Sequence, residues 1–155
     1  MSDILLKGTI LGFEEYREYV LRNIFDDASP FRVLACLEEH IAFLVVNPFV
    51  AAEDYNLEID DAAVSNLGLT GENMQHVAVL CVARKENDHY TVNLRSPLII
   101  NTVEGRFQQV ILQNEAYGME ATLSMSNYPA PAPPAEPSGR PLAGRPPLSS
   151  LRSQK

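Results

Sequence analysis

The sequence predicts an all-β domain, and three observations support this fold class. Apolar residues gather in short runs that turn residues separate, and helix-forming residues do not dominate. The stretch 90–112 contains two or three consecutive strands with very little between them. The chain of 155 residues suits one domain, which at this size buries roughly two-thirds of the surface of its unfolded chain.

The rest of the domain is expected to cover the stretch 90–112. Its first part alternates apolar and polar residues, the period-two pattern of a strand with one buried face. Pro97 lacks an N–H group, so it marks a kink or a switch between sheets. Residues 98–100 (LII) form an apolar run that predicts a strand covered on both faces. Gly105 allows a hairpin turn after Glu104, and 107–112 returns as the partner strand.

Four strands are expected upstream, at 4–10, 19–25, 31–37 and 41–46. Residues 41–46 (IAFLVV) are too apolar for either face to meet water, which predicts a central core strand. This strand ends at Asn47, because Pro48 restricts the residue before it and cannot donate a hydrogen bond.

The middle of the chain predicts another strand, a short helix and a second core strand. Tyr55, Leu57 and Ile59 alternate with polar residues, which predicts a half-buried strand. A helix follows over 62–67, with Asp60 or Asp61 as its N-terminal cap and Gly68 at its end. Residues 77–83 (VAVLCVA) predict a second fully buried strand, whereas 114–125 show no clear periodicity.

The charge of the chain is divided unevenly between a body, residues 1–126, and a tail, residues 127–155. The body holds 19 acidic and 8 basic side chains, a net charge of −11, whereas the tail carries +3. An acidic body repels phosphate, so we expect no direct binding of nucleic acid. Basic proteins or neutral apolar surfaces are the partners that this charge favours.

The tail differs from the body in composition as well as charge. It contains eight of the eleven prolines, mixed with Ala, Ser, Gly and Arg, which predicts a disordered or extended segment outside the fold. Two roles remain open for it: an inert solubilising segment, or a weak screen over the acidic body.

The sequence indicates a cytoplasmic protein. Cys36 and Cys81 lie in apolar runs, which favours buried free thiols over a disulfide. The N-terminus carries an early acid and too short an apolar run for a signal peptide, and no run of about 18 apolar residues is present to cross a membrane. We also expect a monomer.

No pattern of catalytic or metal-binding residues stands out, so we expect neither an enzyme nor a cofactor. His40, His76 and His89 are far apart in the sequence, and a metal site needs three or four convergent ligands. The acid pairs, such as Glu14-Glu15, are adjacent in sequence and point apart in strands or turns, which suits solvated edges better than a catalytic dyad.

A candidate partner-binding site follows the core strand 41–46. Phe49 and Tyr55 flank the acidic residues Glu53 and Asp54 at the end of this strand. Aromatic side chains beside carboxylates supply an anchor and an electrostatic attraction for a basic partner. The alternative is that both aromatic residues simply fill the core.

Several blocks, in this order and spacing, together resemble the FliW family of flagellar assembly factors. They are 10–14 (ILGFE), Pro30-Phe31, 41–49 (IAFLVVNPF), Asp54-Tyr55 with 57–61, Leu67-Gly68, 77–82, 91–94, 96–101 and 109–112, and they span about residues 8–118. The chain departs from the family pattern at Leu11, where Pro is usual, at Asn47, where Asp is usual, and in a shortened segment at 38–40.

The resemblance implies a small antiparallel β-barrel-like domain that acts as a cytoplasmic binding protein. Its implied partners are flagellin and the RNA-binding translational regulator CsrA, which contend for it, so that export of flagellin frees it to restrain CsrA. The competing hypotheses are a β-barrel that binds a small molecule and a hydrolase with an unrecognised site. The apolar strands 41–46 and 77–83 argue against a barrel with a wet cavity.

Overall fold

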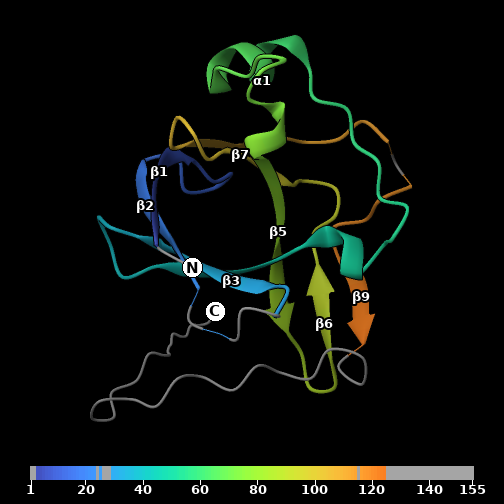
Figure 1. Cartoon of the computed structure of the whole chain (residues 1–155). Helices are drawn as coiled ribbons and strands as arrows, with labels where there is room; N and C mark the ends of the chain where they lie inside the picture. Colours follow the sequence, from blue (N-terminus) through green and yellow to red (C-terminus); the bar gives the residue numbers. More distant parts are fainter. Residues whose placement is uncertain (1–2, 24, 26–28, 115, 125–155) are drawn as a thin grey trace.

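The computed structural model describes residues 3–23, 25, 29–114 and 116–124, and these residues form a β-barrel with an attached strand pair (Figure 1). The strands are β1 (Ile4–Thr9), β2 (Glu18–Arg22), β3 (Phe31–Cys36), β4 (Ala42–Val46), β5 (Val77–Lys85), β6 (His89–Val92), β7 (Leu98–Asn101), β8 (Arg106–Gln109) and β9 (Ala121–Ser124). The helices are α1 (Asp61–Leu67) and the 3-10 helices η1 (Pro48–Val50) and η2 (Met74–His76). The predicted all-β class with one short α-helix is confirmed.

Seven strands close the barrel in the order β4-β3-β2-β1-β8-β7-β5, with β5 returning to β4. Neighbouring strands are antiparallel except at one seam, where β1 runs parallel to β8 and Gly8 lies opposite Phe107. The predicted barrel is therefore present, but its pairing is not wholly antiparallel. The seam is possible because β1 and β8 are far apart in the sequence, and parallel neighbours need a long connection.

The strand β5 belongs to the barrel and also pairs with a two-stranded wing, formed by β6 and β9. Its first half pairs with β7, and its second half pairs with β6, which in turn pairs with β9. The strands of the stretch 90–112 follow one another in the chain as predicted, but β6 and β7 do not pair with each other, since both pair with β5. The break at Pro97 separates them, as its missing N–H group predicted.

The position of β5 explains why its residues 77–83 are all apolar. Ala78, Leu80 and Val82 face the barrel core, together with Leu98 and Ile100 of β7. The intervening residues face two outer clusters, one beneath the wing and one beneath α1. Because both faces of β5 meet apolar neighbours, the usual alternation of polar and apolar residues is absent.

The helix α1 begins at Asp61, one residue before the predicted start, and ends at Leu67 as predicted. Asp60 is the N-cap, and its Oδ1 accepts a hydrogen bond from the Ala63 N–H group at 2.8 Å. Gly68 ends the helix at φ 67°, the left-handed conformation that glycine adopts without steric cost. Leu67 and Leu69 pack against Ile99 of β7, so the helix covers the outer face of that strand.

Three expectations about the elements were wrong. Residues 55–59 form no strand, because Tyr55 packs under the wing and Ile59 packs under α1, in two different clusters. The strand β9 lies in the segment 114–125 for which none was expected. The strand β4 is also less buried than predicted, since only Val45 and Val46 are fully buried.

The tail, residues 127–155, lies outside the described residues, and its disorder stays a prediction. Among the residues that the structure describes, no helix has the length and apolarity needed to cross a membrane.

Candidate functional site

The predicted partner-binding residues lie on η1 and on the turn that follows it. Asn47 follows β4 directly and caps η1, with its Oδ1 accepting a hydrogen bond from the Phe49 N–H group at 3.0 Å. Pro48 occupies the first position of the 3-10 helix, where its missing N–H group costs nothing. Asn47 stands where the family pattern has Asp, and its amide oxygen makes the capping contact that a carboxylate would make.

Tyr55 is a buried member of the wing core and offers almost no surface to a partner. It is 5% exposed, and its hydroxyl donates a 2.6 Å hydrogen bond to the backbone oxygen of Leu94. Burial raises the pKa of this hydroxyl far above its ordinary value. Its ring also contacts Phe49 edge-on, at a centroid distance of 6.0 Å. Tyr55 therefore holds the turn in place, and the surface itself comes from its neighbours.

The exposed part of the predicted site consists of Phe49, Glu53 and Asp54. The Phe49 side chain remains 47% exposed, and both carboxylates face solvent. The chain thus brings one aromatic ring and two acids onto the same short segment, which suits contact with a basic, partly apolar protein surface. That this segment binds a partner stays a prediction.

Tyr117 packs against this segment from a distant part of the chain, and the sequence analysis did not single it out. Its ring lies 4.6 Å from that of Tyr55, and its hydroxyl accepts a 2.7 Å hydrogen bond from the Asn56 N–H group. The residue lies in the stretch 114–125, where no periodicity was visible. Its one signal in the sequence is that it is the single aromatic residue of this stretch.

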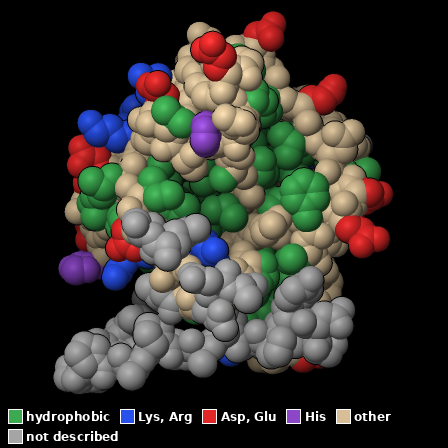
Figure 2. Space-filling model, in the orientation of Figure 1, with side chains coloured by type: hydrophobic (Ala, Val, Ile, Leu, Met, Phe, Trp, Pro, Cys, Tyr) green, Lys and Arg blue, Asp and Glu red, His purple; other side chains and the backbone are tan. Residues whose placement is uncertain are grey.

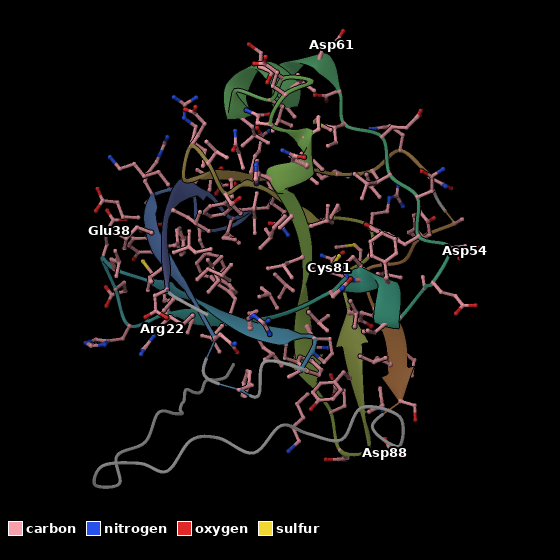
Figure 3. All side chains as sticks on the ribbon, viewed as in Figure 1. Arg22, Glu38, Asp54, Asp61, Cys81 and Asp88 are labelled. Carbon is pink, nitrogen blue, oxygen red and sulfur yellow. The ribbon has the colours of Figure 1, made fainter. Side chains whose placement is uncertain are left out.

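A second acidic region lies across the molecule, at the β1–β2 and β3–β4 turns. Figure 3 places Glu38 of this region and Asp54 on opposite sides of the barrel. The Glu38 Oε1 atom accepts hydrogen bonds from the N–H groups of Glu18, at 2.9 Å, and Arg17, at 2.6 Å, and these bonds lower the pKa of the carboxyl group. Glu38 therefore joins two turns.

Figure 2 shows acidic side chains around the rim of the visible face, with hydrophobic ones near its centre.

An open groove of about 410 Å³ lies at the end of the barrel where β1 and β8 end and β4 begins. Its walls include Ile10, Phe13, Phe43 and Val82. Its rim carries the exposed side chains Leu11, Ile111 and Met119. Its polar lining is Asn93, Arg95, Ser96 and Gln109. The expected complete burial of strands 41–46 and 77–83 fails here, because Phe43 and Val82 are only half-buried.

Side chains that bind metals do not converge in the part of the chain that the structure describes. No cluster of three or more His, Cys, Asp or Glu side chains with metal-binding geometry is present among these residues. His40 lies in a turn, His76 on η2 and His89 on β6. Cys36 and Cys81 are free thiols, and burial raises the pKa of Cys81 to about 12. This thiol is protonated and inert at neutral pH.

The fold and its surfaces define a class, a small seven-stranded β-barrel with an acidic body and several exposed hydrophobic side chains. The family model described as "FliW protein" matches residues 2–123, and the chain belongs to the FliW family.

Proteins named "Flagellar assembly factor FliW" are similar to this chain in sequence and in structure. The protein of Caldicellulosiruptor bescii is 34% identical over 117 residues, which cover 74% of this chain and 74% of the relative. That of Bacillus velezensis is 33% identical over 117 residues and covers 74% and 80%. A crystal structure of the flagellar assembly factor FliW superposes with a TM-score of 0.69 at 29% identity, covering 77% of this chain and 84% of that one. These relatives are named as assembly factors and not as enzymes.

Proposed function

We propose that the chain is a cytoplasmic flagellar assembly factor that binds flagellin and a CsrA-type RNA-binding translational regulator. The family match over residues 2–123 carries this proposal. Bound to the chain, the regulator is kept from flagellin mRNA, and flagellin competes for the chain until it is exported. Translation of flagellin is thereby coupled to assembly. The chain acts as a monomeric binding protein without catalytic activity or cofactor.

The charge of the body supports a basic partner of this kind. A net charge of −11 over residues 1–126 attracts a basic RNA-binding surface and repels the RNA itself. The chain thus favours the regulator over nucleic acid by electrostatics alone, before any specific contact forms.

Titration of the full-length chain into regulator bound to labelled flagellin mRNA tests the proposal directly. We expect the chain to release the RNA, and added flagellin to restore the RNA complex. The association rate of chain and regulator should fall about tenfold or more between low salt and about 0.5 M salt, since exposed charges are screened. A chain that leaves the RNA complex intact contradicts the proposed function. An association rate independent of salt contradicts only its electrostatic part.

Replacing Glu53 and Asp54 together by Lys tests the predicted contact surface. We expect the affinity for the regulator to fall about tenfold with the melting temperature unchanged, because two exposed carboxylates become like charges facing a basic partner. The matched control replaces Glu14 and Glu15, an exposed acidic pair in the β1–β2 turn, by Lys. Calorimetric titration measures both variants, and equal losses in the two would mean that net charge matters and the location does not.

The alternative of a small-molecule-binding barrel has less support. Large apolar side chains, among them Leu34, Val45, Ile100 and Phe107, fill the barrel interior. A small barrel whose interior is packed in this way holds side chains instead of a ligand. A thermal-shift screen against metabolites tests this alternative.

A further inference from the structure

The groove at the end of the barrel has a rim of exposed hydrophobic side chains, in contrast to the acidic surface of the body. Eight large hydrophobic side chains are strongly exposed among the described residues, and three of them, Leu11, Ile111 and Met119, surround this groove. Their exposed fractions are 42%, 57% and 64%. Single exposed hydrophobic residues are ordinary, but several around one hollow mark a contact surface.

The floor of the groove is held in one shape by a buried amide. Gln109 at the end of β8 is 8% exposed, and its Oε1 accepts a 2.8 Å hydrogen bond from the Leu11 N–H group. Its Nε2 donates a 2.9 Å hydrogen bond to the Ser96 backbone oxygen. One side chain thus joins the end of β1 to the loop between β6 and β7. A preformed floor lowers the entropy that binding would cost.

Among the residues that the structure describes, Arg95 is the only ionisable side chain that lines the groove, although the body as a whole is strongly acidic. Its Nε donates a 3.0 Å hydrogen bond to the Leu112 backbone oxygen, which fixes the half-buried guanidinium group. Arg22, Arg84 and Arg106 each lie within 4 Å of a carboxylate, whereas no described carboxylate pairs with Arg95. A planar guanidinium with free N–H groups on an apolar surface recognises a carboxylate by paired hydrogen bonds.

We propose that this groove is the docking site for a peptide segment that presents aliphatic side chains to the rim and a carboxylate to Arg95. The inference rests on the proposed function, and of its two partners it assigns the groove to flagellin and the acidic segment at Glu53 and Asp54 to the regulator. The two partners then compete because their bodies exclude each other, and not because they share the same contacts. A basic RNA-binding protein does not match a groove whose only charge is positive. A free fatty acid shares the ligand chemistry but needs its chain enclosed, whereas this groove is open along an exposed rim.

The experiment compares flagellin and regulator binding to the full-length chain by calorimetry. The groove variants are Arg95→Gln, Ile111→Ser and Met119→Ser. We expect each to weaken flagellin binding about tenfold or more, since each removes an anchoring or charge-assisted contact, with regulator affinity within about twofold of wild type. Arg95→Lys should recover part of the affinity, because it restores the charge without the planar pair of donors.

Matched controls lie at the opposite end of the barrel. Val103 is 59% exposed in the β7–β8 turn, close to the 57% of Ile111, so Val103→Ser controls for loss of an exposed aliphatic side chain. Arg22→Gln, at the end of β2, controls for the loss of one positive charge. Both controls should bind flagellin like wild type. Melting temperatures of all variants identify any loss of affinity that comes from unfolding.

The outcomes separate the two proposals. A wild-type chain that binds neither flagellin nor the regulator overturns the proposed function and this inference with it. If the wild-type chain binds flagellin and folded groove variants bind it equally well, the groove assignment alone is overturned. Loss of regulator binding with flagellin binding retained also overturns it. Decanoate that raises the melting temperature of wild type but not of Arg95→Gln would reassign the groove to a fatty acid.

Discussion

Replacing Gly8 by Ala is expected to destabilise the barrel by about 3 kcal/mol, at the upper end of the range for overpacked sites. Gly8 lies in β1 opposite Phe107 of β8, at the parallel seam. A Cβ atom at this position would lie 2.1 Å from the Phe107 backbone oxygen and 2.6 Å from its Cδ1. Because the first of these atoms is backbone, no rotamer change relieves the clash, and the seam must open.

Denaturant unfolding of the full chain measures this effect, with Gly71→Ala as the control. A Cβ atom at Gly71 would meet no other atom within 4 Å, and this glycine does not require a positive φ. We expect the control to change the free energy of unfolding by no more than about 0.5 kcal/mol, as is usual for a surface substitution. A Gly8→Ala chain as stable as the control would show that β1 and β8 can separate without cost.

Asn101→Leu is expected to lower the free energy of unfolding by about 2–4 kcal/mol, because it leaves polar groups without partners. Asn101 is fully buried at the end of β7, and its Nδ2 donates a 2.8 Å hydrogen bond to the Leu67 backbone oxygen at the end of α1. Its Oδ1 accepts hydrogen bonds from the N–H groups of Val103 and Glu104, at 3.1 Å each. Leucine has a similar volume but makes none of these bonds.

The matched control for this substitution is Asn114→Leu. Asn114 is exposed, and its Oδ1 accepts one 2.9 Å hydrogen bond from the Ala116 N–H group within a turn. Water can replace that bond, so we expect a loss of about 1 kcal/mol or less by thermal unfolding. If both variants lose the same stability, the buried position of Asn101 carries no special weight.

Most elements could be predicted because their signals are local. The helix α1 is capped by Asp60 and Gly68 through contacts within a few residues, and β4 ends at Val46, just before Asn47-Pro48. Strand pairing depends on residues far apart, so no local pattern indicated that β1 pairs with β8, or that β6 and β7 share β5. The barrel itself was expected from the family resemblance.

The sequence places the candidate residues on one short segment, but it does not tell which of them are exposed, because exposure depends on residues far away in the chain. An aromatic residue at a strand end has the same sequence signature whether it is exposed, as Phe49 is, or buried, as Tyr55 is. The groove around Arg95 escaped prediction because its apolar residues come from separate segments and each of them suits a core position equally well. Whether a residue at the end of a barrel is exposed depends on the closed fold, and the periodicity within one strand does not indicate it.

The parallel seam also has a consequence for how the chain is made. Lys7 pairs with Arg106, about a hundred positions later, so β1 has no partner on that side until the ribosome has produced β8. Barrels with such distant pairings fold slowly, because a long loop must close before the contacts form. During synthesis β1 therefore has an unpaired strand edge, through which unfinished chains can aggregate. Chaperones, or a lower concentration of unfolded chain during refolding, should improve the yield of folded protein.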